Sequence, residues 1–346
     1  MREEQVIISV VIPAFNEEEV IEQCYDALTK VMRATERPYE LIFVNDGSKD
    51  KTKEIITRYC HEDHHVKLIN FSRNFGHQVA ITAGMEHAQG EAIVVIDADL
   101  QDPPHLILSM MEKWEEGYEV VYAKRSSRKG ETKFKKWTAA CFYRMLSKMT
   151  EVHIPLDTGD FRLIDRKVKE VMSRMKEKNR FVRGLVSWVG FKQTAIEYER
   201  EERFAGETKY PLKKMLRLSM DAITSFSYKP LLMTVYLGFM LSGASFVYLL
   251  YVLYMRLFTD STVTGWSSMV SINLFFFGFT FIMLGIMGQY IARIYDETRD
   301  RPLYIIDTIE HGTEADVDQV QNNINTYEKE HQHSVHTSED AIETRH

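Results

Sequence analysis

Hydrophobic and polar positions alternate in two rhythms as far as residue 200. Short apolar runs, typical of strands, take turns with longer segments in which apolar residues recur at helical spacing. The apolar runs predict strands over Val6–Ile12, Tyr39–Val44, Val66–Asn70, Ala92–Asp97 and Glu119–Ala123. The periodic segments predict helices over Glu17–Arg33, Asp50–Tyr59, Gly76–Ala88 and Pro104–Glu116. This alternation predicts a Rossmann-like α/β domain with a mostly parallel sheet and helices on both faces.

Two later segments are apolar for long enough to cross a bilayer. Leu231–Met255 and Trp266–Ile291 contain no charged residue. At about 1.5 Å per residue, each exceeds a hydrocarbon core of about 30 Å. Basic residues flank the pair on its outer sides, namely Lys209, Lys213, Lys214, Arg217 and Lys229 before it and Arg293, Arg299 and Arg301 after it. The positive-inside rule therefore predicts a cell-membrane protein with two spans and both termini in the cytoplasm. Two buried helices of a soluble bundle are the alternative.

The rest of the pattern divides the chain into further segments. The α/β domain is expected over 1–200, followed by a juxtamembrane segment with an amphipathic helix over 201–229. Two transmembrane helices are expected over 230–295, a cytoplasmic segment over 296–311 and a polar, disordered tail over 312–346. Basic amphipathic stretches at Thr132–Met149 and Leu212–Phe226 are expected to lie on an anionic leaflet. Packing of these two helices against a core is the alternative.

Composition narrows the partners and the compartment. The 346 residues carry a formal net charge of −7, so nucleic acid is not an expected partner. The three cysteines, Cys24, Cys60 and Cys141, lie far apart without metal-ligand spacing and are expected to be reduced thiols. The charged start of the chain and the short apolar run after it predict no cleavable signal peptide. Glycines within the spans would allow close helix packing and a homo-oligomer.

A pair of aspartates stands at the end of the fourth predicted strand. Because Asp97 and Asp99 are two positions apart, both carboxylates point to the same side of an extended strand. Two ionised carboxylates that close repel each other unless a cation lies between them or one keeps its proton. Oxygen ligands suit Mg²⁺ or Mn²⁺, and Mg²⁺ takes further ligands from substrate phosphates. The pair predicts a divalent-metal cofactor and a phosphorylated substrate, and a solvated acidic turn is the competing interpretation.

Five motifs follow one another in the order of a known family. They are Val10–Glu18, Val44–Ser48, Ser72–Gly76, Asp97–Pro103 and Asp157–Arg162. By these motifs the chain resembles, over about residues 6 to 306, the family 2 glycosyltransferases of the GT-A fold. Within that family it is similar to the polyprenyl-phosphate branch related to dolichol-phosphate mannose synthase. The two spans, with Arg293–Glu297 and Arg301–Tyr304 behind them, resemble the bacterial bactoprenol-phosphate enzymes.

The resemblance implies a site for a nucleotide-sugar donor at the strand ends. Pro13, Ala14 and Glu17 would face the nucleoside, although Glu17 also suits a helix N-terminus. Asp46 would accept a hydrogen bond from the base, with a simple turn as the alternative. Arg73 would contact the base or a phosphate, and otherwise is a surface cation.

The resemblance also assigns the metal and a loop over the donor. Asp97 would touch the ribose or a metal-bound water, whereas Asp99, joined by Gln101, would coordinate the metal. The metal would act as a Lewis acid toward the departing diphosphate. Arg203 and Lys209 lie in a stretch that resembles a closing loop of the family. A basic membrane flank explains Lys209 equally well.

A second cluster of motif residues points to the acceptor. In many inverting relatives an aspartate here removes a proton from an acceptor hydroxyl, so Asp157 and Asp160 are the candidate catalytic carboxylates. A phosphomonoester acceptor, with a second pKa of about 6, is largely dianionic at neutral pH and needs holding more than deprotonation. Arg125, Arg128 and Arg162, followed by Arg180 and Arg183, are the candidates for binding a lipid phosphate, because arginine binds phosphate bidentately.

Together these features predict an inverting, metal-dependent glycosyltransferase. It would move a hexose or N-acetylhexosamine from a nucleotide donor, UDP-linked, to undecaprenyl phosphate at the cytoplasmic membrane face, for modification of cell-envelope glycans. A processive polysaccharide synthase is disfavoured because the chain lacks a Gln-x-x-Arg-Trp motif and further spans. A dinucleotide-dependent oxidoreductase is disfavoured because no Gly-x-Gly-x-x-Gly occurs. The alternative from another class is a catalytically silent membrane scaffold or sugar-nucleotide sensor.

Overall fold

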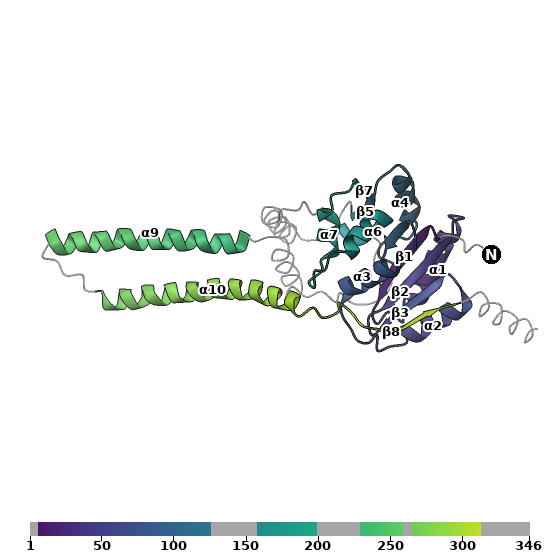
Figure 1. Cartoon of the computed structure of the whole chain (residues 1–346), viewed down its shortest axis with the longest axis horizontal. Coiled ribbons are helices and arrows are strands. Elements are labelled where there is room, and N and C mark those ends of the chain that lie inside the picture. Colours follow the sequence, from purple (N-terminus) through teal and green to yellow (C-terminus); the bar gives the residue numbers. More distant parts are fainter. Residues whose placement is uncertain (1–5, 126–157, 199–228, 259–264, 313–346) are drawn as a thin grey trace, which may run out of the picture.

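The computed structural model describes residues 6–125, 158–198, 229–258 and 265–312, and it shows an α/β domain from which two long helices project (Figure 1). Eight strands form one sheet in the order β7–β5–β6–β4–β1–β2–β3–β8. The strands are β1 (Ile8–Ala14), β2 (Tyr39–Asn45), β3 (Val66–Phe71), β4 (Ala92–Val95), β5 (Val120–Arg125), β6 (Thr158–Asp165), β7 (Gln193–Tyr198) and β8 (Ile306–His311). The helices are α1 (Ile21–Arg33), α2 (Thr52–Glu62), α3 (His77–His87), α4 (Leu106–Glu115), α6 (Arg166–Ser173), α7 (Val182–Trp188), α9 (Lys229–Phe258) and α10 (Trp266–Thr298).

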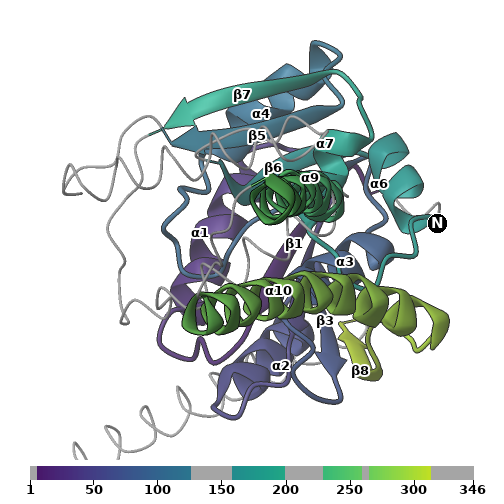
Figure 2. The ribbon, with the colours of Figure 1, turned by 90° about the vertical axis from the view of Figure 1, so that its left-hand side faces the viewer.

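The sheet is mostly parallel, which confirms the predicted fold class. Four of its seven strand pairings are parallel. β6 runs antiparallel to both β4 and β5, and β8 runs antiparallel to β3. Seen along the two long helices, β7 and β5 lie at one edge of the sheet and β3 and β8 at the other (Figure 2). Because β1, β2, β3 and β4 share one direction, their carboxyl ends meet along one edge.

Helices cover both faces of the sheet, as the alternation predicts. Along β2, Leu41 and Phe43 pack into the cluster formed with α1, α2 and α4, whereas Ile42 and Val44 pack into the cluster formed with α3, α6 and α7. Strand side chains alternate between faces, so a strand buried on both sides needs an unbroken apolar run. This double burial explains why the central strands are so easily recognised in the sequence.

The first strand is shifted two residues toward the C-terminus from its predicted position, without a change in length. We expected it to end at Ile12, but β1 continues through Pro13 and Ala14, which pair with Val44 and Asn45 of β2. Backbone polar groups two residues apart on a strand point to the same neighbour, so those of Pro13 point, like those of Val11, toward the β4 side. The Val11 carbonyl accepts from the Ile96 amide, just beyond the end of β4. β4 stops at Val95, so the missing N–H of Pro13 loses no ladder hydrogen bond.

The first helix begins later than predicted. We expected it from Glu17, but α1 begins at Ile21. The amides of Asn16 and Glu17 are instead satisfied by the loop after β2, since they donate to Ser48 Oγ at 3.0 Å and to Thr52 Oγ1 at 2.9 Å. These bonds join the ends of β1 and β2, and they keep residues 15–18 at the strand edge rather than in a helix.

The two long helices extend away from the sheet (Figure 1). Both are long and apolar enough to cross a membrane by length and composition, over Lys229–Met255 and Phe275–Thr298. None of either apolar window is buried within the described structure, and large side chains such as Phe239 and Phe275 are 75% and 67% exposed. The helices are therefore not core helices of the described domain.

Strand β8 is a feature that the sequence analysis did not anticipate. After α10 the chain returns to the domain and adds β8 to the free edge of β3. Its sequence is short and polar, with Asp307, Thr308 and Glu310 between single apolar residues, so it carries little strand signal. The predicted amphipathic stretches at Thr132–Met149 and Leu212–Phe226 and the tail from residue 313 lie outside the described residues.

Close packing of α3 on β1 generates a stability prediction. A Cβ added to Gly84 would clash with Val11 Cγ1, a stiff side chain on a fully buried strand. We expect Gly84→Ala to destabilise the protein by about 1–3 kcal/mol through overpacking, despite the better helix propensity of alanine. Thermal unfolding of the purified protein measures this. The double variant Val11→Ala/Gly84→Ala should lose less stability than the sum of the single variants, and simple additivity would contradict the packing argument.

Candidate active site at the carboxyl ends of the strands

Asp46 organises the loop that follows β3. This residue comes directly after β2 and is only 3% exposed. Its Oδ1 accepts from the Phe75 amide at 2.6 Å, its Oδ2 accepts from the Gly76 amide at 3.0 Å, and its carbonyl accepts from Asn74 Nδ2 at 3.1 Å. Burial raises the pKa of Asp46, and the two backbone hydrogen bonds oppose that rise. The carboxylate therefore shapes residues 74–76, where Gly76 supplies a φ of +105°.

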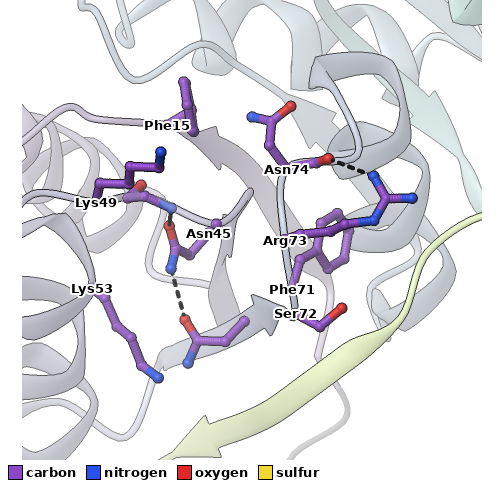
Figure 3. A pocket seen from close by; sticks show the side chains of 11 residues that line it. Phe15, Asn45, Lys49, Lys53, Phe71, Ser72, Arg73 and Asn74 are labelled. Carbon is purple, nitrogen blue, oxygen red and sulfur yellow. Dashed lines mark hydrogen bonds between the residues drawn. The ribbon is translucent and has the colours of Figure 1, made fainter.

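A pocket of about 520 Å³ opens at the ends of β2 and β3 (Figure 3). Its lining combines an aromatic ring, amides and cations, namely Phe15, Asn45, Gly47, Ser48, Lys49, Lys53, Asn70, Phe71, Ser72, Arg73 and Asn74. Arg73 lies with its guanidinium carbon 4.0 Å from the centre of the Phe75 ring and donates to the Asn74 carbonyl at 3.0 Å. On the pocket floor Asn45 Nδ2 donates to Asn70 Oδ1 at 3.0 Å. This lining suits a flat heteroaromatic group that carries an anion.

A buried carboxylate cluster lies beyond the end of β4. β6 pairs Arg162 with Val95, so Asp160 extends past the end of β4 toward Asp97. Arg183 of α7 binds Asp160 through two bonds, Nε to Oδ1 at 2.8 Å and Nη2 to Oδ2 at 2.9 Å. His77 Nε2 lies 3.3 Å from Asp160 Oδ2 and 3.4 Å from Asp97 Oδ1.

Gln78 completes this cluster from α3. Its Nε2 donates to Asp160 Oδ2 at 3.1 Å, and its Oε1 accepts from the Val182 amide at 2.9 Å. The start of α3 thus holds the start of α7. Since His77 and Gln78 follow the loop shaped by Asp46, the pocket and the carboxylate cluster are connected through one short stretch of chain.

The charges in the cluster compensate one another. Burial alone would raise the pKa of Asp160, but the Arg183 guanidinium and the hydrogen bond from His77 hold it well below its usual range. Burial alone would lower the pKa of His77, but Asp160 and Asp97 raise it to about 9. Burial, with Asp160, Asp102 and Asp99 nearby, raises the pKa of Asp97 to about 6 against the effect of His77. At neutral pH the cluster therefore holds an anionic Asp160 between two cations.

The DAD segment, Asp97–Asp99, and the residues that follow it fit a hard divalent cation. Among the described residues, Gln101 Oε1 and Asp97 Oδ1 are buried oxygens that make no hydrogen bond, although His77 Nε2 lies 3.4 Å from Asp97 Oδ1. Asp99 Oδ1 accepts from the Gln101 amide at 3.1 Å, which turns the chain tightly after the aspartate. Buried acceptor oxygens without donors are costly in a folded protein unless a cation or ligand satisfies them. Asp97, Asp99 and Gln101 are therefore the group that could hold Mg²⁺ or Mn²⁺.

Arg162 lies in the interior rather than at the surface. It is 3% exposed, and its guanidinium donates to the carbonyls of Gly159 at 2.9 Å and Asp160 at 3.2 Å. Burial lowers the pKa of Arg162 to about 10. The structure thus uses Arg162 to support the strand that carries Asp160, whereas the side chain of Arg183 is 31% exposed next to the same carboxylate.

The other predicted residues are distributed along the same edge or fall outside the description. Pro13 and Ala14 are the buried last residues of β1, and Glu17 lies in the turn after it. Burial raises the pKa of the Cys24 thiol, and the nearby charges of Asp99, Glu17 and Asp97 raise it further. Arg125 is the last residue of β5. Four predicted residues lie outside the described residues, namely Arg128, Asp157, Arg203 and Lys209.

Sequence reasoning missed His77 and Gln78, and it named Arg183 only as a further candidate for the lipid phosphate, not as a partner of Asp160. His77 and Gln78 follow directly after the Ser72–Gly76 motif, so their position was the available signal. Arg183 lies 23 residues after Asp160 on a short helix, and only the fold brings the two together.

Comparisons with known proteins identify the family. Residues 9–172 match the family model "Glycosyl transferase family 2". The chain is 66% identical over 298 residues to the uncharacterized glycosyltransferase YkcC of Bacillus subtilis (strain 168), covering 86% of this chain and 92% of that one. It is 40% identical over 305 residues to the bactoprenol glucosyl transferase of Shigella phage SfII, covering 88% of this chain and 99% of that one.

A search of solved structures finds the glucosyl-3-phosphoglycerate synthase of Mycobacterium tuberculosis, crystallised with Mn²⁺ and UDP, at 18% identity and a TM-score of 0.42 over 63% of this chain and 78% of that one. The sequence relatives are far more similar, and two of them match along most of both chains. On that extent of identity, the chain belongs to glycosyltransferase family 2.

Proposed function

We propose that this glycosyltransferase moves a hexose or N-acetylhexosamine from a UDP-linked donor to undecaprenyl phosphate, with inversion at the anomeric carbon. The relatives named bactoprenol glucosyl transferase support the acceptor. The observation that carries the proposal is the carboxylate cluster of Asp97 and Asp160, connected through His77 to a pocket with aromatic, amide and cationic walls.

The donor fits the chemistry of the pocket and of the DAD segment. Phe15 is 39% exposed at the pocket wall and offers a ring for stacking on a base. Asn45 and Asn74 offer amides for its polar edge, and Arg73 offers a charge for a phosphate. Asp97, Asp99 and Gln101 would hold Mg²⁺ or Mn²⁺, which when bound neutralises negative charge on a departing nucleoside diphosphate.

The acceptor needs orientation rather than deprotonation. One bond forms between a phosphate oxygen and the anomeric carbon as the bond from that carbon to the diphosphate breaks. A dianionic phosphomonoester requires no proton transfer in this exchange. Asp160 has a strongly lowered pKa and is a poor base, so in the proposal it positions Arg183, whose exposed side binds the acceptor phosphate.

The position of the long helices supports catalysis at a membrane surface. α9 leaves the described domain and α10 returns to it, since β8 pairs with β3 of the same sheet. If both helices cross the membrane, the chain before α9 and after α10 lies on one side. The basic residues outside the two spans favour the cytoplasmic side. A lipid-linked phosphate at the bilayer surface then lies within reach of the domain.

The first experiment tests the reaction itself. Purified full-length protein is incubated with undecaprenyl phosphate, Mg²⁺ or Mn²⁺ and a panel of UDP-linked and GDP-linked sugars. We expect one UDP-sugar to give UDP and a polyprenyl monophosphate β-linked sugar, identified by mass spectrometry and by its anomeric coupling constant. Release of free sugar alone with every donor would contradict the acceptor, and an α-linked product would contradict inversion.

The second experiment tests the DAD segment. We expect Asp99→Asn to lower kcat/KM by about 100-fold or more, because it removes a carboxylate that would hold the metal ion, and that ion stabilises the leaving diphosphate. Binding of Mn²⁺, followed by titration calorimetry, should weaken in parallel. Asp26→Asn on the exposed side of α1 is the matched control and should match the wild type. Undiminished turnover in Asp97→Asn/Asp99→Asn would instead favour a metal-independent enzyme.

The third experiment tests the acceptor-side arginine. Arg183→Lys keeps a positive charge near Asp160 but loses the two-pronged contact. We expect the KM for undecaprenyl phosphate to rise about tenfold or more, with the Kd for UDP unchanged, because lysine binds phosphate as a point charge. Arg174→Lys is the matched control. An equal loss of UDP affinity would contradict a role on the acceptor side.

A further inference from the structure

We propose that the segment after the second long helix, Tyr304–Glu310, supports the lining of the donor pocket from behind and so positions the nucleotide. This inference rests on the proposed function, because it assigns the pocket to the nucleoside of the donor. Three of the residues that line the pocket, Lys53, Asn70 and Phe71, are each held from behind by a residue of this segment.

The firmest contact runs through the pocket floor. Asn70 is 1% exposed, and its Nδ2 donates to Thr308 Oγ1 at 2.8 Å and to Glu310 Oε1 at 3.3 Å. Its Oδ1 accepts from Asn45 Nδ2, and Asn45 Oδ1 accepts from the Ser48 amide at 3.1 Å. A buried amide with all these partners is fixed in one orientation. The orientation of the floor is therefore set by β8.

The second contact is aromatic and reaches Arg73. The Tyr304 ring stacks on Phe71 with centroids 5.2 Å apart, and its hydroxyl donates to Glu86 Oε2 at 2.6 Å. Phe71 in turn meets Phe75 edge to face at 5.6 Å, and Arg73 lies over Phe75. Each ring limits the positions of the next, so Tyr304 sets where the Arg73 loop stands. The third contact, Lys53 to Asp307 at 3.9 Å, is exposed and contributes little.

The segment is anchored along its whole length. Five residue pairs join β8 to β3, and the Ser72 amide donates to the Ile305 carbonyl at 3.0 Å. Nearer to α10, the Lys178 amide donates to Glu297 Oε1 at 2.7 Å, and Lys178 Nζ lies 3.4 Å from Asp300. The end of α10 is thus tied to the domain through Lys178, and β8 is tied to it through β3. The donor site is consequently built from chain that precedes both long helices and chain that follows them.

Two substitutions in the full-length protein test the inference. Thr308→Val removes the acceptor of the Asn70 amide at nearly constant shape, and Tyr304→Ala removes the ring behind Phe71. For each we expect the Kd for UDP and the KM for the sugar donor to rise about two- to tenfold, as for the loss of one positioning contact. We expect kcat and the KM for undecaprenyl phosphate to stay unchanged. Tyr304→Phe, which keeps the ring, should recover most of the affinity lost in Tyr304→Ala.

The control and the opposing outcomes keep the inference separate from stability and from the proposed function. His311→Ala lies on the same strand beyond this segment, with an exposed side chain, and should bind UDP like the wild type. Partial unfolding would lower the stoichiometry of UDP binding in calorimetry without changing its Kd. Wild-type Kd and KM values in both Thr308→Val and Tyr304→Ala would overturn the inference alone. Wild-type protein that binds no nucleotide would overturn the proposed function and the inference together.

Discussion

The site depends on keeping one buried carboxylate charged. Asp160 is 3% exposed, and such an ion is tolerated only because Arg183 contacts both of its oxygens and His77 lies beside it. Those two partners come from α7 and α3, so the ion pair also fixes the helices on that face of the sheet. The same contacts therefore compensate the buried charge and hold the helices of the site together. Loss of either cation would weaken this compensation, and loss of Arg183 would remove the contacts to both oxygens of Asp160.

The same compensation separates the roles of the two aspartates. Asp160 is held ionised by its cations, whereas Asp97, crowded by burial and by other carboxylates, has its pKa raised to about 6. An added cation stabilises the charged form of a carboxylate whose pKa is raised. The buried oxygens of Asp97 and Gln101 are the atoms that such a cation would contact. The metal side and the acceptor side of the proposed reaction therefore differ in electrostatics although they share His77 as a neighbour.

Sequence patterns predicted the sheet better than its edges. β2 is buried on both faces, so its apolar run identified it almost to the residue, and Asp97 and Asp99 were recognisable because they interrupt such a run. β8 escaped notice because an exposed edge strand needs few apolar residues, and its partner β3 lies more than two hundred residues earlier. The pairing of Arg183 with Asp160 escaped for the same reason, because the fold and not spacing along the chain brings the two together. Local burial leaves a local signal, whereas pairing across the chain leaves none.

The edge strand also constrains how the protein meets a membrane. β8 can complete the sheet only if the chain that leaves through α9 comes back through α10 to the same side, so the hairpin and the sheet form one structural unit. The returning chain is attached to Lys178, in the loop between α6 and α7, and through Tyr304 to Glu86 of α3. A shift of α10 relative to the domain would strain those attachments and the pocket floor at once. If the hairpin anchors the protein in a membrane, the geometry of the proposed donor pocket also depends on where the hairpin ends.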